Sequence, residues 1–349
     1  MKKSILALLL CFVILLTLTA CGPDIENSQP PQGDPQKPAS STPTHSQQVQ
    51  PSQTQPTDPA TDYTKYLRFK LNDDEQSYTA YTTPSGYNGP GTELVIPSHY
   101  KDLPVTVVKD LHLSKSDVER VVLPDTVIEL GDYAFSDSKV KDVVFSKNLQ
   151  KIGDCAFSGC TSLTQVDLPE GLVEIGASAF RRTSLTSLVL PSTVAEMGMD
   201  CFAELEHLTE VTITCAGGRA FKDCPALKTV TVIQGAGDSI GDKAFYDCDA
   251  LECVVFEGDN ITHIYSDAFR RCSVLATVTL PSKLEFIGSK AFGSCYALET
   301  LEIPDSVTKM EEDALMTDMS GAPHGTIICR EGSYAEKYAK QNKYTVTTK

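Results

Sequence analysis

Cysteine is the residue type with the greatest chemical potential in this sequence, because ten cysteines follow Cys21. Thiolates bind zinc, but zinc sites usually combine two closely spaced cysteine pairs, and only the pairs Cys155–Cys160 and Cys248–Cys253 approach that spacing. Disulfides between neighbouring segments, or buried thiols that pack as small apolar groups, are the alternatives. Five cysteines share one position, three residues after a phenylalanine, which favours buried thiols: Cys160, Cys224, Cys248, Cys272 and Cys295.

The remaining residues provide no candidate for catalysis. The six histidines share no common position and no His-x-x-x-His spacing, so we expect them on the surface or in turns. The segment 235–243 superficially resembles a phosphate-binding loop, but it lacks the required spacing and the Ser or Thr after Lys243. Carboxylates are plentiful, and no pair of them stands out. We therefore expect no enzymatic activity, no metal site and no cofactor.

The phenylalanines that precede these cysteines mark an internal repeat. Phe stands at positions 135, 157, 180, 202, 221, 245, 269 and 292, and Leu315 replaces it in a ninth copy, so the copies are 19 to 24 residues apart. A period in this range is typical of solenoids. In each copy a Leu-x-x-Val-x-Leu stretch predicts a short strand with alternate residues inward, and Pro often ends it. An apolar-Gly pair then predicts a turn with Gly at φ > 0, and the Ala-Phe pair predicts a short helical or 3₁₀ segment that plugs the interior.

Two copies, residues 163–180 and 275–292, contain the full motif Pro-x-x-Val/Leu-x-x-Ile-Gly-x-x-Ala-Phe. This motif resembles the BspA-like, or TpLRR-type, leucine-rich repeats of bacterial surface proteins, and the resemblance covers roughly residues 94–349. It implies a leucine-rich-repeat solenoid of right-handed α/β-type or β/3₁₀ coils, about nine to ten in number, with a parallel sheet on one face. Copy five, residues 214–221, lacks the Pro and the Ile-Gly pair, so we expect a kink or a tightened coil there.

The first 62 residues predict an anchor and a tether. Lys2 and Lys3 precede an apolar run, as in export signals. Leu18-Thr-Ala-Cys21 resembles the lipobox of bacterial lipoproteins, in which the signal is removed before a cysteine that carries diacylglycerol. This resemblance implies lipidation of Cys21, and an uncleaved membrane anchor is the alternative. The residues that follow are rich in Pro, Gln, Ser and Thr, which predicts a disordered tether.

Caps are predicted at both ends of the repeats. Residues 66–83 alternate as two strands around Asn72, and Ser333-Tyr-Ala-Glu336 is a capping box that opens a helix to about Asn342. The expected organisation is a signal peptide over 1–20, the lipidated Cys and tether over 21–62, an N-terminal β cap over 63–93, repeats over 94–320 and a C-terminal cap over 321–349.

The exposed side of the stacked strands is the candidate binding face, because solenoids usually bind through such a surface. It carries no aromatic residue and one Arg, and its Val and Thr are the types that any exposed sheet prefers. Tyrosines outside the strands, such as Tyr133, Tyr246, Tyr265 and Tyr296, offer a lateral surface instead. The candidate residues of the strand face are Arg120, Asp142, Gln165, Asp167, Ser187, Glu210, Thr212, Thr229, Thr231, Thr277, Thr279, Thr300 and Glu302.

The net charge of −16 disfavours nucleic acid and anionic membrane surfaces as partners. Relatives in the resembled family are described as adhesins. The resemblance therefore implies a monomeric, lipid-anchored module on the extracellular face of the bacterial membrane that binds a protein or glycoprotein of a host or microbial surface. The alternative is a structural or accessory envelope lipoprotein that scaffolds other cell-wall components.

Overall fold

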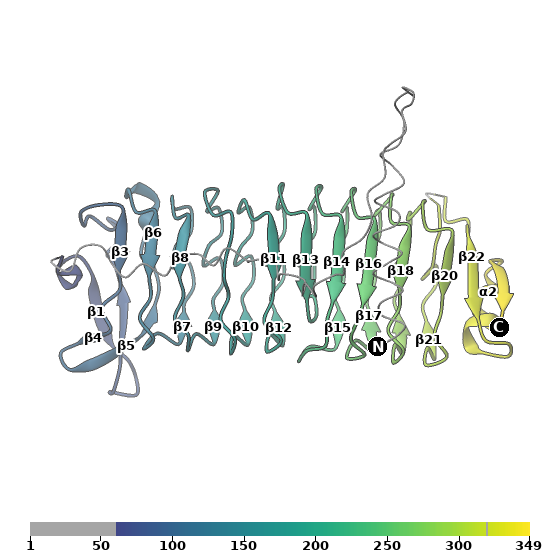
Figure 1. The fold of residues 1–349 in the computed structure, drawn as a ribbon, viewed down its shortest axis with the longest axis horizontal. Helices are drawn as coiled ribbons and strands as arrows, with labels where there is room; N and C mark the ends of the chain where they lie inside the picture. Colours follow the sequence, from purple (N-terminus) through teal and green to yellow (C-terminus); the bar gives the residue numbers. More distant parts are fainter. Residues whose placement is uncertain (1–60, 319) are drawn as a thin grey trace, which may run out of the picture. The chain divides into compact units, whose positions relative to one another are not determined.

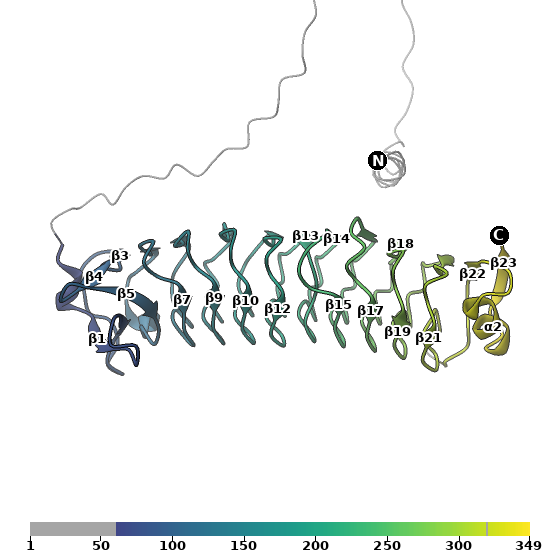
Figure 2. The ribbon, with the colours of Figure 1, turned by 90° about the horizontal axis from the view of Figure 1, so that it is seen from below.

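The computed structural model describes residues 61–318 and 320–349. The predicted signal peptide, Cys21 and almost all of the predicted tether lie outside the described residues. The described residues form a stack of short coils, one beside the next along a single long axis (Figures 1 and 2). Two ladders of strands run along this axis, so that the apolar edges of neighbouring coils cover each other.

The first ladder contains the strands that the Leu-x-x-Val-x-Leu stretches predict, and its pairs are parallel. We call its outward side the strand face. It divides into three sheets, because residues 165–167 form no strand and β18 does not pair with β20. The strands are β3 (Glu93–Val95), β6 (Arg120–Val122) and β8 (Asp142–Val144); β11 (Ser187–Val189), β13 (Glu210–Ile213), β14 (Thr229–Val232), β16 (Cys253–Phe256) and β18 (Thr277–Thr279); and β20 (Thr300–Glu302), β22 (Thr326–Cys329) and β23 (Thr345–Thr348).

A second ladder, which the sequence analysis did not predict, is made mostly of two-residue strands (Figure 1). The last residue of each is the apolar member of an apolar-Gly pair or its equivalent, and it points into the core. This ladder is interrupted between β12 and β15, at the shortened copy five, where a single bridge joins Ala216 to Ile240. The irregularity expected in copy five therefore takes the form of a missing strand. The strands are β7 (Glu129–Leu130), β9 (Lys151–Ile152), β10 (Glu174–Ile175), β12 (Glu196–Met197), β15 (Ser239–Ile240), β17 (His263–Ile264), β19 (Phe286–Ile287) and β21 (Lys309–Met310).

A β-hairpin closes the N-terminal end of the second ladder. β1 and β2 pair antiparallel around the turn predicted at Asn72, whose side chain donates to Ser77 Oγ (2.8 Å) and accepts from Thr79 Oγ1 (2.6 Å). β2 then pairs parallel with β5, which continues the ladder into β7. The elements of this end are η1 (Tyr63–Lys65), β1 (Arg68–Leu71), β2 (Tyr78–Tyr81), β4 (His99–Tyr100), β5 (Leu103–Val108) and η2 (Leu113–Lys115).

The C-terminal cap is built as the capping box predicts. The helix α2 (Tyr334–Gln341) begins after Ser333, whose Oγ accepts a hydrogen bond from the Glu336 amide (3.2 Å). The Glu336 carboxylate accepts from the Gly332 amide (2.7 Å), one residue before the N-cap amide that a capping box uses. Tyr338 fastens the helix to the preceding coil, because its hydroxyl donates to the Glu311 carbonyl (2.8 Å).

The stack has about twelve turns, more than the nine to ten predicted. The additional turns lie at the two ends, where β2 and β5 at one end and β22 and β23 at the other join the ladders. These turns lack the marker Phe and fill their interior with other buried residues, such as Ala80, Val105 and Ile327. A count based on the marker therefore misses them.

The marker phenylalanines form one column through the interior. All of them, from Phe135 to Phe292, are fully buried, and Leu315 continues the column. Neighbouring ring centroids are 4.9 to 5.4 Å apart. From Phe157 to Phe292 neighbouring ring planes differ by no more than 10°. The aligned column confirms the predicted solenoid core.

The glycines of the apolar-Gly pairs correct one prediction, because none of them has the positive φ expected. They allow close approach instead. A Cβ placed on Gly176 would lie 2.6 Å from both the Asp154 nitrogen and the Gly153 carbonyl carbon in the preceding coil. A Cβ on Gly288 would lie 2.6 Å from the Ser266 nitrogen. Successive coils thus touch backbone to backbone beside Gly176 and Gly288, which leaves no room for a side chain there, whereas two other copies hold Tyr265 and Glu311 at the equivalent position.

The Ala-Phe segments form consecutive turns, which corrects the predicted helical or 3₁₀ segments. Two residues of each turn lie in the left-handed region; around Phe245 they are Lys243 (φ 55°) and Asp247 (φ 59°). A left-handed residue ends a helix, so two of them four residues apart leave no room for a helical segment. Most of these positions hold polar residues other than Gly, so the residue types did not reveal the conformation.

Candidate functional site

The strand face places the predicted binding residues in columns at the surface. None of the candidate residues is buried. In the central sheet Ser187, Glu210 and Thr229 are register neighbours, and Thr212 pairs with Thr231 in the next column. Parallel pairing therefore assembles a surface from residues that lie about one repeat apart in the chain.

The division of the first ladder limits how far this surface is continuous. Gln165 and Asp167 are exposed, but they belong to the copy that forms no strand, between β8 and β11. Arg120 and Asp142 lie in the first sheet, whereas Thr300 and Glu302 lie in the last. The central sheet, β11 to β18, is the largest continuous part of the strand face.

Arg120, the single arginine of the strand face, is held by two carboxylates. Its Nε donates to Glu93 (3.1 Å) on one neighbouring strand, and its Nη1 donates to Asp142 on the other. The three side chains form one ion-paired row across β3, β6 and β8. Because its charge is already paired, Arg120 is a weaker anchor for a partner than an unpaired arginine would be.

The five cysteines that follow the marker phenylalanines are buried thiols, as the shared position favours. Each Sγ donates to a marker-Phe carbonyl of an earlier coil; Cys272 reaches Phe245 O at 3.1 Å and Cys295 reaches Phe269 O at 3.1 Å. Burial raises the pKa of the Cys295 thiol to about 12, and that of Cys272 well above its ordinary value. None of the ten cysteines among the described residues forms a disulfide, and no group of His, Cys, Asp and Glu side chains in that part of the chain could hold a metal ion.

The hydrogen bonds from the buried thiols to the marker-Phe carbonyls lead to a prediction about Cys272. Cys272→Ser retains a donor for the Phe245 carbonyl, whereas Cys272→Ala leaves this buried acceptor without it. We therefore expect the alanine variant to be less stable than the serine variant by about 1 kcal/mol in urea unfolding. Ser138 and Thr183 occupy the same position in other copies, which shows that a hydroxyl fits. An alanine variant at least as stable as the serine variant would mean that the thiol acts by packing alone.

Residues 237–241 have the Gly-x-Ser-x-Gly spacing of a nucleophile elbow, which the sequence analysis overlooked. In such an elbow the serine stands on a tight turn between a strand and a helix. Ser239 lies instead within β15, beside His263 of β17. The His263 Nδ1 is hydrogen-bonded to Thr262 Oγ1 (2.8 Å), and the imidazole ring packs against Tyr265 and Phe286. This arrangement lacks the architecture that activates a serine.

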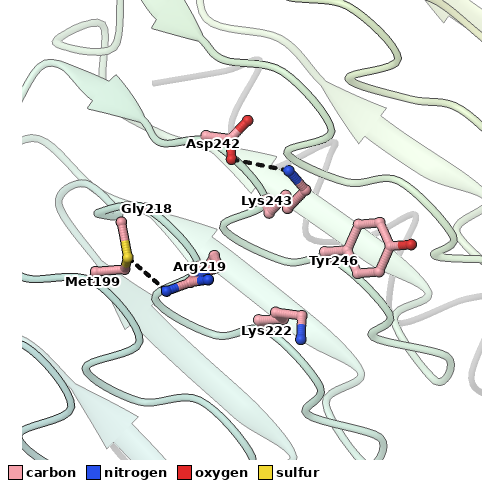
Figure 3. Close-up of a pocket in the computed structure, with 7 residues that line it drawn as sticks. All are labelled: Met199, Gly218, Arg219, Lys222, Asp242, Lys243 and Tyr246. Carbon is pink, nitrogen blue, oxygen red and sulfur yellow. Dashed lines mark hydrogen bonds and ion pairs between the residues drawn. The ribbon is translucent and has the colours of Figure 1, made fainter.

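The turns that carry the marker phenylalanines form a further surface, the turn ridge, which holds two adjoining hollows. One hollow of about 420 Å³ is lined by Arg219, Lys222, Lys243 and Tyr246, among others (Figure 3). A second of about 610 Å³ begins at the same tyrosine and extends to Tyr296. We call the two together the turn groove. It runs along several coils of the stack.

Six ion pairs hold charged residues of the turn groove, three between neighbouring turns and three within one turn. These ion pairs hold the side chains in place without leaving a large net charge at the surface. The pairs are Arg219 with Asp200 (2.6 Å), Lys222 with Asp223 (2.8 Å), Lys243 with Asp242 (3.3 Å) and Asp267 (3.6 Å), Arg270 with Asp267 (3.0 Å), and Arg271 with Asp247 (2.9 Å).

Tyr246 and Tyr296 were predicted to lie on a lateral surface outside the strands, but the turn groove itself was not predicted. A comparison of equivalent positions would have drawn attention to it. The position after the marker Phe holds Ser or Arg in several copies, but Tyr246 in one copy and Gly293 in another. The position after the repeat glycine holds Asp, Ala, Ser or Met elsewhere, but Gly218 in copy five. The form of the two hollows depends on these residues, which differ from those of the other copies.

A family model described as "BspA type Leucine rich repeat region" matches residues 106–217 and 210–319 of the chain, in six copies. The chain belongs to this family. BspA-type repeat proteins are typically cell-surface proteins that generally bind other proteins, and their leucine-rich-repeat homologues are non-enzymatic scaffolds. No helix among residues 61–318 and 320–349 is long and apolar enough to cross a membrane.

Solved structures of bacterial leucine-rich-repeat proteins are similar to this BspA-type chain. One is TpLRR of T. pallidum, at 26% identity and a TM-score of 0.48, over 54% of this chain and 88% of that one. Another is from Bacteroides ovatus, at 21% identity and a TM-score of 0.41, over 81% and 98%. The pneumococcal vaccine antigen PcpA matches at 16% identity and a TM-score of 0.38, over 81% and 97%. A search of the curated proteins found no significant match.

Proposed function

We propose that this BspA-type protein is a lipid-anchored adhesion module on the extracellular face of the bacterial membrane. In this proposal it binds, as a monomer, a protein or glycoprotein of a host or microbial surface through the strand face. The supporting observation is the central sheet of the first ladder, which holds the outward residues of five strands in register on one surface. These residues are exposed on β11, exposed or partly buried on β13 and β18, and mostly partly buried on β14 and β16. Such a rigid surface needs little reordering on binding, which lowers the entropic cost of association.

The central sheet also has properties that suit contact with a protein. Val189 is 65% exposed, which is unusual for a valine, and it lies beside Thr212 and Thr231 in one column. From Thr229 to Thr279 the outward residues of the sheet carry no charge. A partner can therefore cover this part of the strand face without removing charged groups from water.

Paired arginine substitutions test the strand face. We expect Thr212→Arg and Thr231→Arg to weaken binding to immobilised host extracellular-matrix proteins by about tenfold or more, because each places a long charged side chain in the contact. Thr308→Arg, at an exposed position close to β21 of the second ladder, is the matched control and should bind as the unmodified protein does. Equal binding by all three variants would exclude the strand face. Retention of the bacterium's own envelope proteins alone would favour the scaffolding alternative.

The anchor is tested separately. Cys21→Ala removes the thiol that the lipobox resemblance assigns to the diacylglycerol thioether, so we expect the variant to stay unprocessed or to appear in the culture medium. Metabolic labelling with a fatty-acid analogue, followed by fractionation, measures both outcomes. Cys155→Ala, which changes a cysteine of the folded repeats, is the control and should remain labelled. A Cys21→Ala protein that still incorporates label would contradict lipidation at this residue.

A further inference from the structure

We propose that the turn groove binds a neutral glycan chain. This inference concerns a surface other than the strand face, and it does not depend on the function proposed above. It rests on three features of the turn groove: its shape, its two tyrosines and the balance of its charges.

The shape of the turn groove suits a chain ligand. The two hollows have volumes of about 420 and 610 Å³, within the range of sites that accept small molecules, and they meet at Tyr246. Gly218 and Gly293 leave space where other copies carry a side chain. Since the hollows follow one another along the stack, an extended ligand can occupy both, whereas a single sugar would fill only part of one.

Two tyrosines offer aromatic surface to such a ligand. Tyr296 is 47% exposed, and Tyr246 is half-buried at the junction of the hollows. The Arg270 and Arg271 guanidinium groups lie 6.0 and 5.8 Å from the centre of the Tyr246 ring, and Arg271 Nη1 donates to the Tyr246 hydroxyl (3.5 Å). A ring that is apolar on its face and polar at its hydroxyl suits a sugar, which presents C–H groups on one side and hydroxyls at its rim.

The charges of the turn groove favour a neutral, polar ligand. Its cations are interleaved with carboxylates, and Asp242, Asp249 and Asp313 line the same hollows. An anionic ligand would meet these carboxylates, and a cationic ligand would meet Arg219, Lys222 and Lys243. Sugar hydroxyls both donate and accept hydrogen bonds, so they can use groups of either sign that ion pairing already holds in place.

The residues that line the turn groove suit a glycan better than they suit the core of a protein interface. Such cores are depleted in Lys, Asp and Ser, the types that Lys290, Asp313 and Ser273 contribute here. A structural role for the ion pairs would explain the charged residues. It would not explain why the tyrosines and glycines depart from the repeat at neighbouring turns, because neither type is needed for those pairs.

The test uses the whole chain, purified in detergent, on an array of neutral oligosaccharides built from glucose, galactose, mannose or N-acetylglucosamine, with a sulfated oligosaccharide as the anionic probe. We expect at least one neutral oligosaccharide to bind. Tyr246→Ala and Tyr296→Ala should each weaken this binding about tenfold. Tyr296→Phe, which retains the aromatic ring, should bind nearly as tightly as the unmodified protein. Tyr133→Ala removes a 54% exposed tyrosine from a distant turn and should change nothing.

Several results would overturn the proposal. They are the absence of binding to every neutral oligosaccharide, binding of the sulfated probe alone, and binding that the tyrosine variants leave unchanged. If the tyrosine variants lost only the matrix proteins retained in the strand-face experiment, the turn groove would be a protein-binding surface instead. Because Thr212→Arg and Thr231→Arg alter only the strand face, loss of one surface is distinguishable from loss of the other.

Discussion

Phe245→Ala is expected to lower the free energy of unfolding by about 3–5 kcal/mol. The Phe245 ring is fully buried and lies 5.2 Å from both the Phe221 and the Phe269 rings. Its removal leaves a cavity in the middle of the column, where neither neighbour can close the gap without leaving its own coil. Urea unfolding followed by circular dichroism measures the loss. Because each coil contacts only its neighbours, we also expect a broader transition as the two halves become less coupled.

Phe245→Leu is the matched control for this prediction. Leu315 fills the same position in the ninth copy and is fully buried, so the column accepts a leucine. We expect this variant to lose about 1 kcal/mol. Equal losses for Leu and Ala would show that the aromatic ring matters more than the filled volume, whereas negligible losses for both would contradict a column that holds the stack together.

Gly176→Ala should destabilise the protein by about 1–3 kcal/mol, through overpacking. The new Cβ would meet backbone atoms of the preceding coil at 2.6 Å, and backbone atoms cannot move aside as a flexible side chain can. The coils would have to separate locally, which weakens the second ladder between β9 and β10. Unfolding in urea under the conditions used for Phe245→Ala provides the measurement.

Gly218→Ala separates this explanation from a general cost of replacing glycine. The nearest atom to a Cβ on Gly218 is the Asp242 carbonyl oxygen at 3.7 Å, an ordinary contact, and Gly218 does not have a positive φ. We expect a change within about 0.5 kcal/mol. If both alanine variants were equally stable, close approach between coils would not be the reason for the repeat glycine.

The sequence predicted the features that recur at one position of many copies. The Phe column, the strands of the first ladder and the buried thiols each follow from one residue type at one repeated position. The helix after Ser333 was predicted because a capping box is a local signal that needs no knowledge of distant contacts. Repetition and local chemistry are what a single sequence reveals most directly.

The features that the sequence did not predict depend on contacts between coils. One chain segment cannot show whether position 176 requires glycine for a positive φ or for close contact with a neighbouring backbone. The left-handed residues vary in type, and although Asp recurs among them, Lys243 and others are types that do not indicate this conformation. The turn groove arises from side chains on separate copies, and it becomes visible only when equivalent positions are placed side by side. The strand face as a binding surface and the lipid on Cys21 stay predictions.

The interruptions of the two ladders fall in different coils, and this has a mechanical consequence. The first ladder lacks hydrogen bonds at residues 165–167, and there β9, β10 and β12 of the second ladder are continuous. The first ladder also lacks hydrogen bonds between β18 and β20, and there β17, β19 and β21 of the second ladder are continuous. The second ladder is interrupted between β12 and β15, where the strands from β11 to β16 are continuous. A tensile force along the axis of the stack therefore meets an intact row of backbone hydrogen bonds in every cross-section. Pulling on the ends of the stack thus loads at least one row of backbone hydrogen bonds between every two neighbouring coils.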